Sequence, residues 1–289
     1  MERLGVIANC SKPRAAEVLA RLEQRAVALG LKLVACKETA QLLSRPEQAL
    51  PPEEVCSNVD VVLALGGDGT MLRVVRALQG SSIPVLGVNI GSLGFLTSVA
   101  EKDLDRALTC LHDDDYSTSV RSVALCDVLK GGTGVEAAQF QALNDVVVHT
   151  GRSLRVVTLN VSIDEEEVTS YICDGLIIST PTGSTGHAMS TGGPIVHPAT
   201  RAFIITPICS HALSVRPLVI PDASAISIRV AESSDKLTLS IDGQIGQSLV
   251  AGDRLAVRRG AHDVAVVHLP NYSYFSLLRQ KLGWRGSSV

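Results

Sequence analysis

The sequence predicts an α/β protein in two parts, and three observations support this. Of the 289 residues, 46% are hydrophobic and only 3% aromatic, so aliphatic side chains can fill one large core or two ordinary ones. Strand-like and helix-like segments alternate up to about residue 115, which favours a parallel sheet covered by helices. Strands dominate thereafter. We therefore expect an α/β domain over 1–115, a β-rich domain over 116–268 and a closing segment, 269–289, packed back on the first domain.

The first domain alternates short β-branched runs with amphipathic helices. A helix is expected to begin near Pro13, because apolar residues then recur at helical spacing until Gly30 supplies a stop. Prolines at 46, 51 and 52 indicate a loop before the most apolar strand. The expected strands are 4–8, 31–35, 59–65 and 83–88, and the expected helices are 13–29, 70–78 and 104–111.

The second domain shows the alternation of strands that have one face in water. A glycine-rich turn over 131–134 is expected to join strands over 120–130 and 135–149. Further strands are expected over 156–163, 168–173, 226–230 and 237–241. The residues from 272 to 282 are apolar enough to form a closing helix.

Composition excludes several classes of protein. The 26 basic and 29 acidic residues give a net charge of −3, which predicts no nucleic-acid partner and no basic face for a membrane. No apolar run is long enough to span a bilayer, and the N-terminus reads as a strand rather than a signal peptide. Seven scattered cysteines without a C-x-x-C pair suit a reducing cytoplasm, and no histidine pair suggests a structural metal. We therefore expect a cytoplasmic protein without a protein-bound metal site.

The sharpest motif is Gly66-Gly67-Asp68-Gly69-Thr70, between an apolar strand and a helix. Glycines let the backbone approach a ligand closely, and backbone N–H groups at a helix start attract phosphate oxygens. A carboxylate in such a turn would repel phosphate, so Asp68 requires another reason. A Mg²⁺ ion held between them, or a hydroxyl group to deprotonate, would supply it.

A second motif runs from Asp174 through Gly186, where an aliphatic strand opens into hydroxyls and glycines. The loop continues to Gly192-Gly193-Pro194. Small polar side chains of this kind offer many hydrogen bonds to a polar ligand and little bulk to exclude it. We expect this loop to contact such a ligand.

Taken together, these motifs resemble those of NAD kinases over nearly the whole chain. The resemblance rests also on Gly87-Val88-Asn89, Gly94-Phe95-Leu96, Asn144-Asp145, Ile205-Thr206-Pro207-Ile208 and Asp242-Gly243-Gln244. It implies an N-terminal Rossmann-like α/β domain and a C-terminal β-sandwich-like domain, with the active site between them. It also implies transfer of a phosphoryl group from ATP or polyphosphate, with Mg²⁺, to the 2′-hydroxyl of the adenosine ribose of NAD, giving NADP, in a homodimer or homotetramer.

The resemblance also assigns residues. It implies that Asp68 is the general base. The residues that it implies for binding phosphates and the dinucleotide are Gly66, Gly67, Gly69, Thr70, Arg73, Asn144, Asp145, Arg155, Asp174, Thr182, Gly183, Ser184, Thr185, Gly186, His187, Ala188, Ser190 and Gln244.

Two positions depart from the pattern of the resemblance. Gly186-His187 stands where Ala-Tyr is common. His187 keeps a flat ring, and histidine as a residue type can change its charge in the neutral pH range, which tyrosine cannot. Ile172 stands where a polar or basic residue is frequent.

Two alternatives stay open at this point. One is a lipid or sphingoid-base kinase that uses the same glycine turn. The other is a silent pyridine-nucleotide sensor, against which Asp68 argues, since binding alone gains nothing from a carboxylate near phosphates. The sequence leaves the phosphoryl donor, the preference between NAD and NADH, and the oligomer size open.

Overall fold

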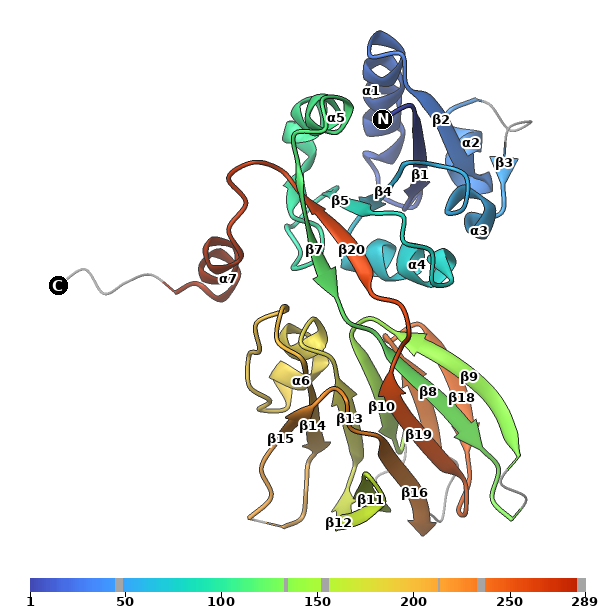
Figure 1. Ribbon diagram of the computed structural model, residues 1–289, viewed down its shortest axis with the longest axis vertical. Helices are drawn as coiled ribbons and strands as arrows, with labels where there is room; N and C mark the ends of the chain where they lie inside the picture. Colours follow the sequence, from blue (N-terminus) through green and yellow to red (C-terminus); the bar gives the residue numbers. More distant parts are fainter. Residues whose placement is uncertain (45–48, 133–134, 152–155, 213, 233–236, 285–289) are drawn as a thin grey trace, which may run out of the picture. The chain divides into compact units, whose positions relative to one another are not determined.

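The computed structural model describes residues 1–44, 49–132, 135–151, 156–212, 214–232 and 237–284. It divides the chain into two compact units (Figure 1). The first unit comprises Met1–Val120 and Val264–Val289, and the second comprises Arg121–Asp263. Among the described residues, no helix has both the length and the apolar character needed to cross a membrane.

The first unit is a sheet covered by helices. Its strands follow the order β3-β2-β1-β4-β5-β20-β7, with β6 beside β5, and β1 to β5 pair in parallel. Its strands are β1 (Arg3–Ala8), β2 (Lys32–Cys36), β3 (Ala49–Leu50), β4 (Val61–Gly66), β5 (Val85–Asn89), β6 (Val99–Ala100), β7 (Ser117–Arg121) and β20 (Val264–His268). Its helices are α1 (Ala15–Ala28), α2 (Lys37–Leu42), α3 (Pro52–Val55), α4 (Asp68–Leu78), η2 (Glu101–Asp103), α5 (Leu104–His112) and α7 (Tyr274–Leu282).

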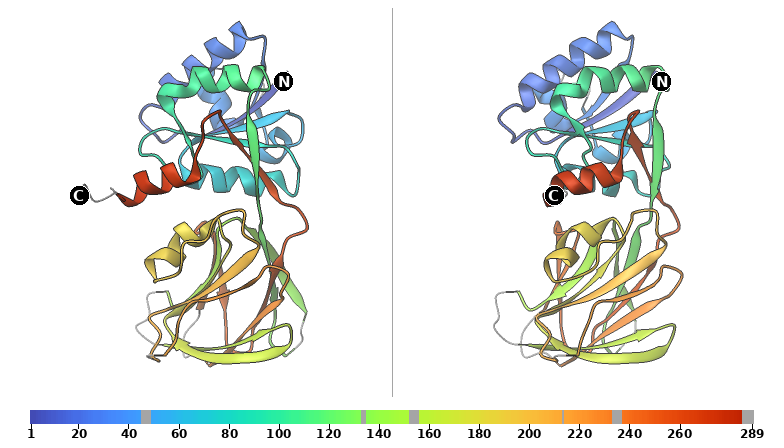
Figure 2. Two further views of the ribbon diagram at one scale, coloured as in Figure 1. Left: turned by 60° about the vertical axis from the view of Figure 1, so that its left-hand side comes forward. Right: turned by 90° about the vertical axis from the view of Figure 1, so that its left-hand side faces the viewer.

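Helices α1 and α5 lie side by side on one face of this sheet (Figure 2). Val18, Leu19 and Leu22 of α1 are buried there at helical spacing. The opposite face carries α3, which packs closely on Gly5 of β1, since a Cβ there would lie 3.0 Å from Val59 and 3.1 Å from Val55. In α7, Lys281 donates a hydrogen bond to the carbonyl of Leu93 at 2.7 Å, within the same unit.

The boundary between the units differs from the sequence-based expectation. We expected residues 116–268 to form the β-rich domain, but β7 and β20 belong to the sheet of the first unit. Val266 of β20 pairs in parallel with Val85 of β5, a partner that is remote in sequence. An alternating strand pattern shows that a strand exists but does not specify its neighbour. The single strand expected over 120–130 is accordingly split into β7 and β8.

The second unit is a sandwich of two antiparallel sheets. The strand orders are β15-β14-β13-β10-β17-β18 and β12-β11-β16-β19-β8-β9. The elements are β8 (Ala124–Leu129), β9 (Glu136–Ala142), β10 (Asp145–His149), β11 (Val157–Ile163), β12 (Glu166–Cys173), β13 (Gly175–Ser179), η3 (Gly183–Thr185), α6 (His187–Ser190), β14 (Ala202–Ile208), β15 (Leu218–Pro221), β16 (Ile226–Glu232), β17 (Leu237–Ile241), β18 (Ile245–Leu249) and β19 (Arg254–Arg259).

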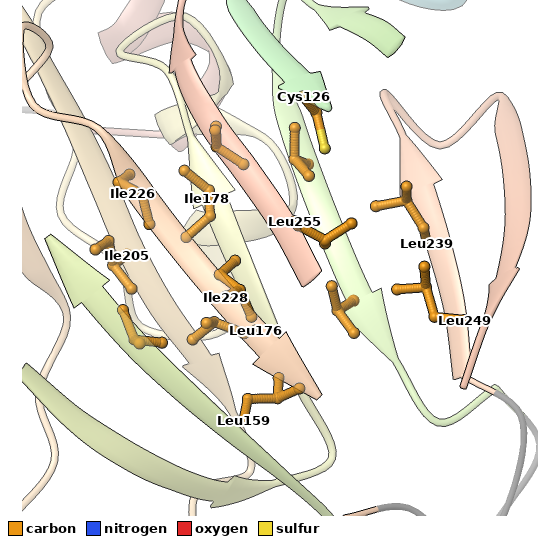
Figure 3. Packing of buried hydrophobic residues seen from close by; sticks show 14 of the residues in the cluster. Cys126, Leu159, Leu176, Ile178, Ile205, Ile226, Ile228, Leu239, Leu249 and Leu255 are labelled. Carbon is orange, nitrogen blue, oxygen red and sulfur yellow. The ribbon is translucent and has the colours of Figure 1, made fainter. Parts of the chain in front are cut away.

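Alternate residues of both sheets fill the core of this sandwich. Leu176 and Ile178 of β13 lie in one buried cluster with Ile226 and Ile228 of β16 (Figure 3). The opposite residues of β10, which do not enter this core, are thereby free to build a site. The expected strand over 135–149 is in fact β9 and β10, in different sheets, and the chain turns between them at Leu143-Asn144.

Candidate active site

The glycine-rich turn lies at the point where the sheet of the first unit reverses its order. The chain builds β1, β2 and β3 outward in one direction, and β4 then returns to the other side of β1. Ligands of open α/β sheets bind outside the carboxyl ends of the strands at such a switch point. Residues 66–70 follow β4 there, and Asn9 follows β1.

The start of α4 shows why glycine is needed. α4 begins at Asp68, two residues earlier than expected, with Gly67 extended at the N-cap. Gly66 is buried at the end of β4, where a Cβ would collide with the side chain of Thr70. The turn uses some of its own N–H groups, since Thr70 N donates to the carbonyl of Gly67 at 2.9 Å and Gly67 N donates to the Thr70 hydroxyl at 3.5 Å. It is therefore a weaker backbone cradle than its glycine content suggests.

The carboxylate of Asp68 holds a second turn in place. It accepts hydrogen bonds from the backbone N–H groups of Phe95 (2.8 Å), Leu96 (3.0 Å) and Thr97 (3.1 Å). The Thr97 hydroxyl donates a fourth, at 3.1 Å. Gly94 is required beside it, because a Cβ there would collide with Asp68 Oδ1. Three of the four bonds reach Oδ1. Among the described residues Oδ2 accepts only from Phe95 and so keeps capacity for another donor.

A cationic cavity of about 340 Å³ adjoins the turn. It is lined by Asn9, Lys12, Gly67, Gly69, Thr70 and Arg73. Arg73 donates to the carbonyl of Ala8 at 2.7 Å and so ties α4 to β1. The Nε atom of Arg73 is buried and has no partner among the described residues. No carboxylate lines this cavity, which therefore suits an anion.

The second unit has a polar cavity of about 380 Å³ on the face of β10 that points away from the sandwich core. It is lined by Asn144, Asp145, Val147, His149, His187, Ser240, Asp242 and Gly243. Asp145, Val147 and His149 alternate along β10 and so share one face. The Oδ1 atom of Asn144 is buried without a partner in the described structure, so it can accept a hydrogen bond from a ligand.

Asp242 builds one end of this cavity. Its carboxylate accepts from the backbone N–H groups of Leu143 (2.9 Å), Asn144 (2.7 Å) and Asp145 (3.0 Å), which fixes the corner between β9 and β10. Burial, and secondarily the charge of Asp242, raises the pKa of Asp145 to about 7. The Asp145 carboxyl group thus exchanges its proton near neutral pH.

Two histidine rings line the same cavity. The Nδ1 atom of His149 accepts a hydrogen bond from the backbone N–H of Gly151 at 3.0 Å. Burial, and then the neighbouring His187, lowers the pKa of His149. With Nδ1 as an acceptor, the neutral ring carries its proton on Nε2 and can donate it to a ligand.

The loop after β13 is held mainly by its own polar groups. The Ser184 hydroxyl donates to the carbonyl of Pro181 at 2.7 Å and accepts from Val196 N at 3.0 Å, and Ser184 is fully buried. Gly183 lies against Asn144, where a Cβ would collide with the Asn144 backbone. Glycine at 183 therefore lets the loop and the Asn144 corner meet.

The rest of this loop is divided between packing and exposed positions. Ala188 is buried with Val147 and Ile177 in a small apolar cluster, which seats α6 on the sheet. The Thr185 and Ser190 hydroxyls donate to carbonyls within the loop, and Gly186 connects η3 to α6. The Thr182 hydroxyl oxygen is buried without a partner in the described part of the chain.

Two expected residues lie away from the polar cavity, and a third is not described. Asp174 stands between β12 and β13, where its hydrogen bond and charge raise the pKa of the exposed Cys209. Gln244 is in the exposed turn after Asp242, and neither it nor Asp174 lines the polar cavity. Arg155 lies outside the described residues.

The structure also adds residues that the sequence interpretation did not select, namely Asn9, Lys12, His149 and Ser240. The sequence did contain a signal for Asn9 and Lys12, because both lie in the loop that follows the first parallel strand, and ligands bind at a switch point in such loops. His149 could have been predicted from the strand pattern, because alternate residues of β10 share one face and His149 lies four residues after Asp145. Ser240 reaches the cavity only through the pairing of β17 with β10, which local patterns do not reveal.

A cavity lined by basic side chains at the switch point of a parallel sheet is typical of nucleotide-binding proteins, and the chain adds a β-sandwich to such a sheet. Family models narrow the class. The ATP-NAD kinase N-terminal domain matches residues 4–116, and the ATP-NAD kinase C-terminal domain matches residues 143–269. The chain belongs to the NAD kinase family, whose members are phosphotransferases that convert NAD to NADP.

Individual relatives agree over almost the full length. The NAD kinase of Syntrophotalea carbinolica is 38% identical over 284 residues, 98% of this chain and 99% of the relative. The NAD kinase of Heliobacterium modesticaldum is 39% identical over 286 residues, which cover 98% of this chain and 99% of the relative.

Two solved structures are similar in fold. Yeast NADH kinase, complexed with NADH, matches with a TM-score of 0.91 at 26% identity, covering 99% of this chain and 89% of that one. An NAD kinase from Archaeoglobus fulgidus, in complex with ATP, matches with a TM-score of 0.77 at 24% identity, covering 98% of this chain and 100% of that one. At this identity the match shows similarity of fold alone.

Proposed function

We propose that this enzyme transfers the terminal phosphoryl group of ATP to the 2′-hydroxyl of the adenosine ribose of NAD, with Asp68 as general base. The observation that carries the proposal is the position of Asp68, in the turn that borders an anion-binding cavity. Phosphoryl transfer depends on positioning the reactants and on compensating the negative charge of the donor. Asp68 supplies a proton acceptor in the turn beside the cavity, and Lys12 and Arg73 of the cavity supply positive charge.

The donor side belongs to the first unit. Lys12 and Arg73 give the cavity positive charge, and the start of α4 adds the favourable end of a helix dipole. The family models that match both units are those of ATP-NAD kinases, which supports ATP as the donor.

Magnesium would accompany the donor as part of the substrate. Mg²⁺ in phosphoryl-transfer sites is held by one or two carboxylates together with phosphate oxygens. Asp68 turns its carboxylate towards Phe95, Leu96 and Thr97, and no carboxylate lines the donor cavity. We therefore propose that magnesium enters with the donor as Mg-ATP.

The dinucleotide side belongs to the second unit. The Asn144 Oδ1 atom and the Asp145 carboxyl can accept hydrogen bonds from an amine such as that of adenine, and the His187 ring offers a flat surface. The yeast relative was solved with NADH, which supports a nicotinamide dinucleotide in this unit. We retain Thr182, Thr185, Gly186, Ser190, Asp174, Arg155 and Gln244 as proposed contacts, and Gly183, Ser184 and Ala188 as residues that shape the loop.

The Asp68 carboxylate has a defined task in this reaction. As the ribose oxygen forms a bond to the terminal phosphorus, the bond from that phosphorus to the bridging oxygen breaks and ADP leaves. The proton of the ribose hydroxyl passes to Oδ2 of Asp68, the oxygen with spare acceptor capacity. The four existing hydrogen bonds hold the carboxylate still while this occurs.

Asp68→Asn tests the general base. Loss of a positioned base costs roughly 10²–10⁴-fold in rate, so kcat should fall at least about a hundredfold while the KM for NAD changes little. Because Asp68 also holds the turn at Thr97, Thr97→Val is the control. It removes the hydroxyl bond to the carboxylate and the bond that this hydroxyl accepts from Asn89 Nδ2, and it leaves the charge of Asp68. An Asp68→Asn enzyme within tenfold of the parent, or a Thr97→Val enzyme equally impaired, would show that Asp68 is not the base.

A coupled assay for NADP from NAD and Mg-ATP separates the remaining alternatives. A silent sensor would bind NAD and form no NADP. The family match over both units argues against a lipid or sphingoid-base kinase, which would phosphorylate diacylglycerol and not NAD.

We also propose that the enzyme works in the cytoplasm as a homodimer or homotetramer. Its described cysteines are free thiols, as expected in a reducing compartment. The edge strand β15 exposes Val219, which a second copy could cover. Sedimentation at two protein concentrations would give the oligomer size.

A further inference from the structure

Lys12 stands out among the residues that line the donor cavity. It lies in the loop between β1 and α1, and it faces the glycine turn across the switch point of the sheet. Neither the glycine motif nor any other motif of the resemblance includes it.

The backbone around Lys12 is fixed, although its side chain is exposed. Lys12 N donates to the carbonyl of Asn9 at 3.2 Å, and Ala15 N donates to the carbonyl of Lys12 at 3.0 Å. The Asn9 side chain accepts from the N–H (3.2 Å) and hydroxyl (2.7 Å) of Ser11. The loop thus presents the ammonium group from a defined position and leaves the flexible stem free to adjust.

The other basic groups nearby are already engaged. Arg73 is anchored to the carbonyl of Ala8, and Arg14 forms ion pairs with Glu17 at 3.2 Å and with Glu101 at 2.7 Å. No ion pair involving Lys12 occurs within the described residues. Its charge is therefore available to an incoming anion.

The turn itself cannot supply all the donors that a triphosphate needs. Gly67 N and Thr70 N are used within the turn, and Met71 N donates to the carbonyl of Gly67 at 3.2 Å. Much of the compensation of phosphate charge must then come from side chains. Among the residues that line the cavity, these are Lys12 and Arg73.

We propose that Lys12 binds the terminal phosphates of the donor and so is a substrate-binding residue of the transfer reaction. This inference rests on the proposed function, because it takes a nucleoside triphosphate as the donor. A Lys side chain acts as a mobile point charge, which can follow the terminal phosphate as it moves from donor to acceptor. Arg73 lines the same cavity but is tied to the carbonyl of Ala8, so it also positions α4.

Lys12→Met and Lys12→Arg test the assignment, with Lys32→Met as the matched control. Lys32 is an exposed lysine of the same unit, but it begins β2 and so lies at the opposite, amino-terminal edge of the parallel strands. The measurements are the KM for ATP, the KM for NAD, and the affinity for inorganic tripolyphosphate by titration calorimetry without NAD or metal.

A hydrogen bond to a charged group corresponds to about a 10- to 100-fold loss of affinity when it is removed. Lys12→Met should therefore raise the KM for ATP and the Kd for tripolyphosphate by that factor, with the KM for NAD within twofold. Lys12→Arg should recover most of the loss, and Lys32→Met should behave as the parent.

Unchanged tripolyphosphate binding and ATP KM in a folded Lys12→Met enzyme would overturn the assignment. An equal loss in Lys32→Met would overturn it too, because the effect would then be one of overall charge. If the parent forms no NADP, the proposed function fails, whereas the tripolyphosphate titration still decides the role of Lys12.

Discussion

Replacement of Asp145 by asparagine should stabilise the protein at alkaline pH, although most substitutions of buried residues destabilise. Asp145 is 5% exposed, and burial beside Asp242 raises its pKa to about 7. In the unfolded chain the same group titrates near about 3.9. Between these values the folded state holds a proton that the unfolded state has lost, so the free energy of unfolding decreases as pH rises.

Each pH unit in this interval is worth about 1.4 kcal/mol, so the parent should lose roughly 2–3 kcal/mol between pH 5 and pH 7 from this group alone. Above about pH 7 the loss is complete. Asparagine has nearly the same shape and does not titrate. The stability of Asp145→Asn relative to the parent should therefore increase by the same amount from pH 5 to pH 8.

Denaturant unfolding of both proteins at pH 5, 6, 7 and 8 measures this difference directly, since other titrating groups cancel between parent and variant. Asp253→Asn is the control, because the pKa of Asp253 is lowered in the folded protein whereas that of Asp145 is raised. Burial tends to raise the pKa of Asp253, but hydrogen bonds from Lys130, Gly131 N and Val250 N lower it overall. That variant should be less stable than the parent at pH 8. A difference between Asp145→Asn and the parent that stays constant with pH would refute the reasoning.

Two further predictions concern single contacts. In Gly94→Ala the new Cβ collides with Asp68 Oδ1, so thermal unfolding should show a loss of about 1–3 kcal/mol, together with reduced kcat. Gly246→Ala, whose Cβ would meet only ordinary contact at 3.9 Å from Thr238, should not show this loss. His187→Ala should raise the KM for NAD severalfold, since a stacked ring contributes about 0.5–1.5 kcal/mol. The same variant should raise the pKa of His149 in an NMR titration, because in the parent both burial and the charge of His187 lower that pKa. An unchanged His149 pKa in the variant would contradict the arrangement of the two rings.

Periodicity and turn chemistry were sufficient to predict most of the first unit. The all-buried β4 and the stripe of Val18, Leu19 and Leu22 in α1 are local patterns, and the structure has both. The short helices α2 and α3 lie in a segment that its prolines made look like a loop, because a helix of one or two turns leaves little periodic signal. Strand partners such as that of β20 depend on contacts remote in sequence.

The site could be predicted as a set of residues but not as a set of contacts. The sequence singles out Asp68 as chemically unusual, and the structure adds its four hydrogen bonds to residues 27 to 29 positions away. Lys12 escaped the sequence interpretation because lysine in a loop is ordinary until β1 and β4 are known to be neighbours.

Asp242 shows how a motif residue can act through the site that it builds. The resemblance assigns a contact to Gln244 of the Asp-Gly-Gln motif, yet it is the Asp242 carboxylate that accepts three backbone hydrogen bonds from residues 143–145. Those bonds orient Asn144 and Asp145 towards the polar cavity. The same negative charge adds to the effect of burial on the Asp145 pKa. One carboxylate therefore positions the two residues that we propose to bind the dinucleotide, and it adds to the effect of burial that moves the pKa of Asp145 to about 7.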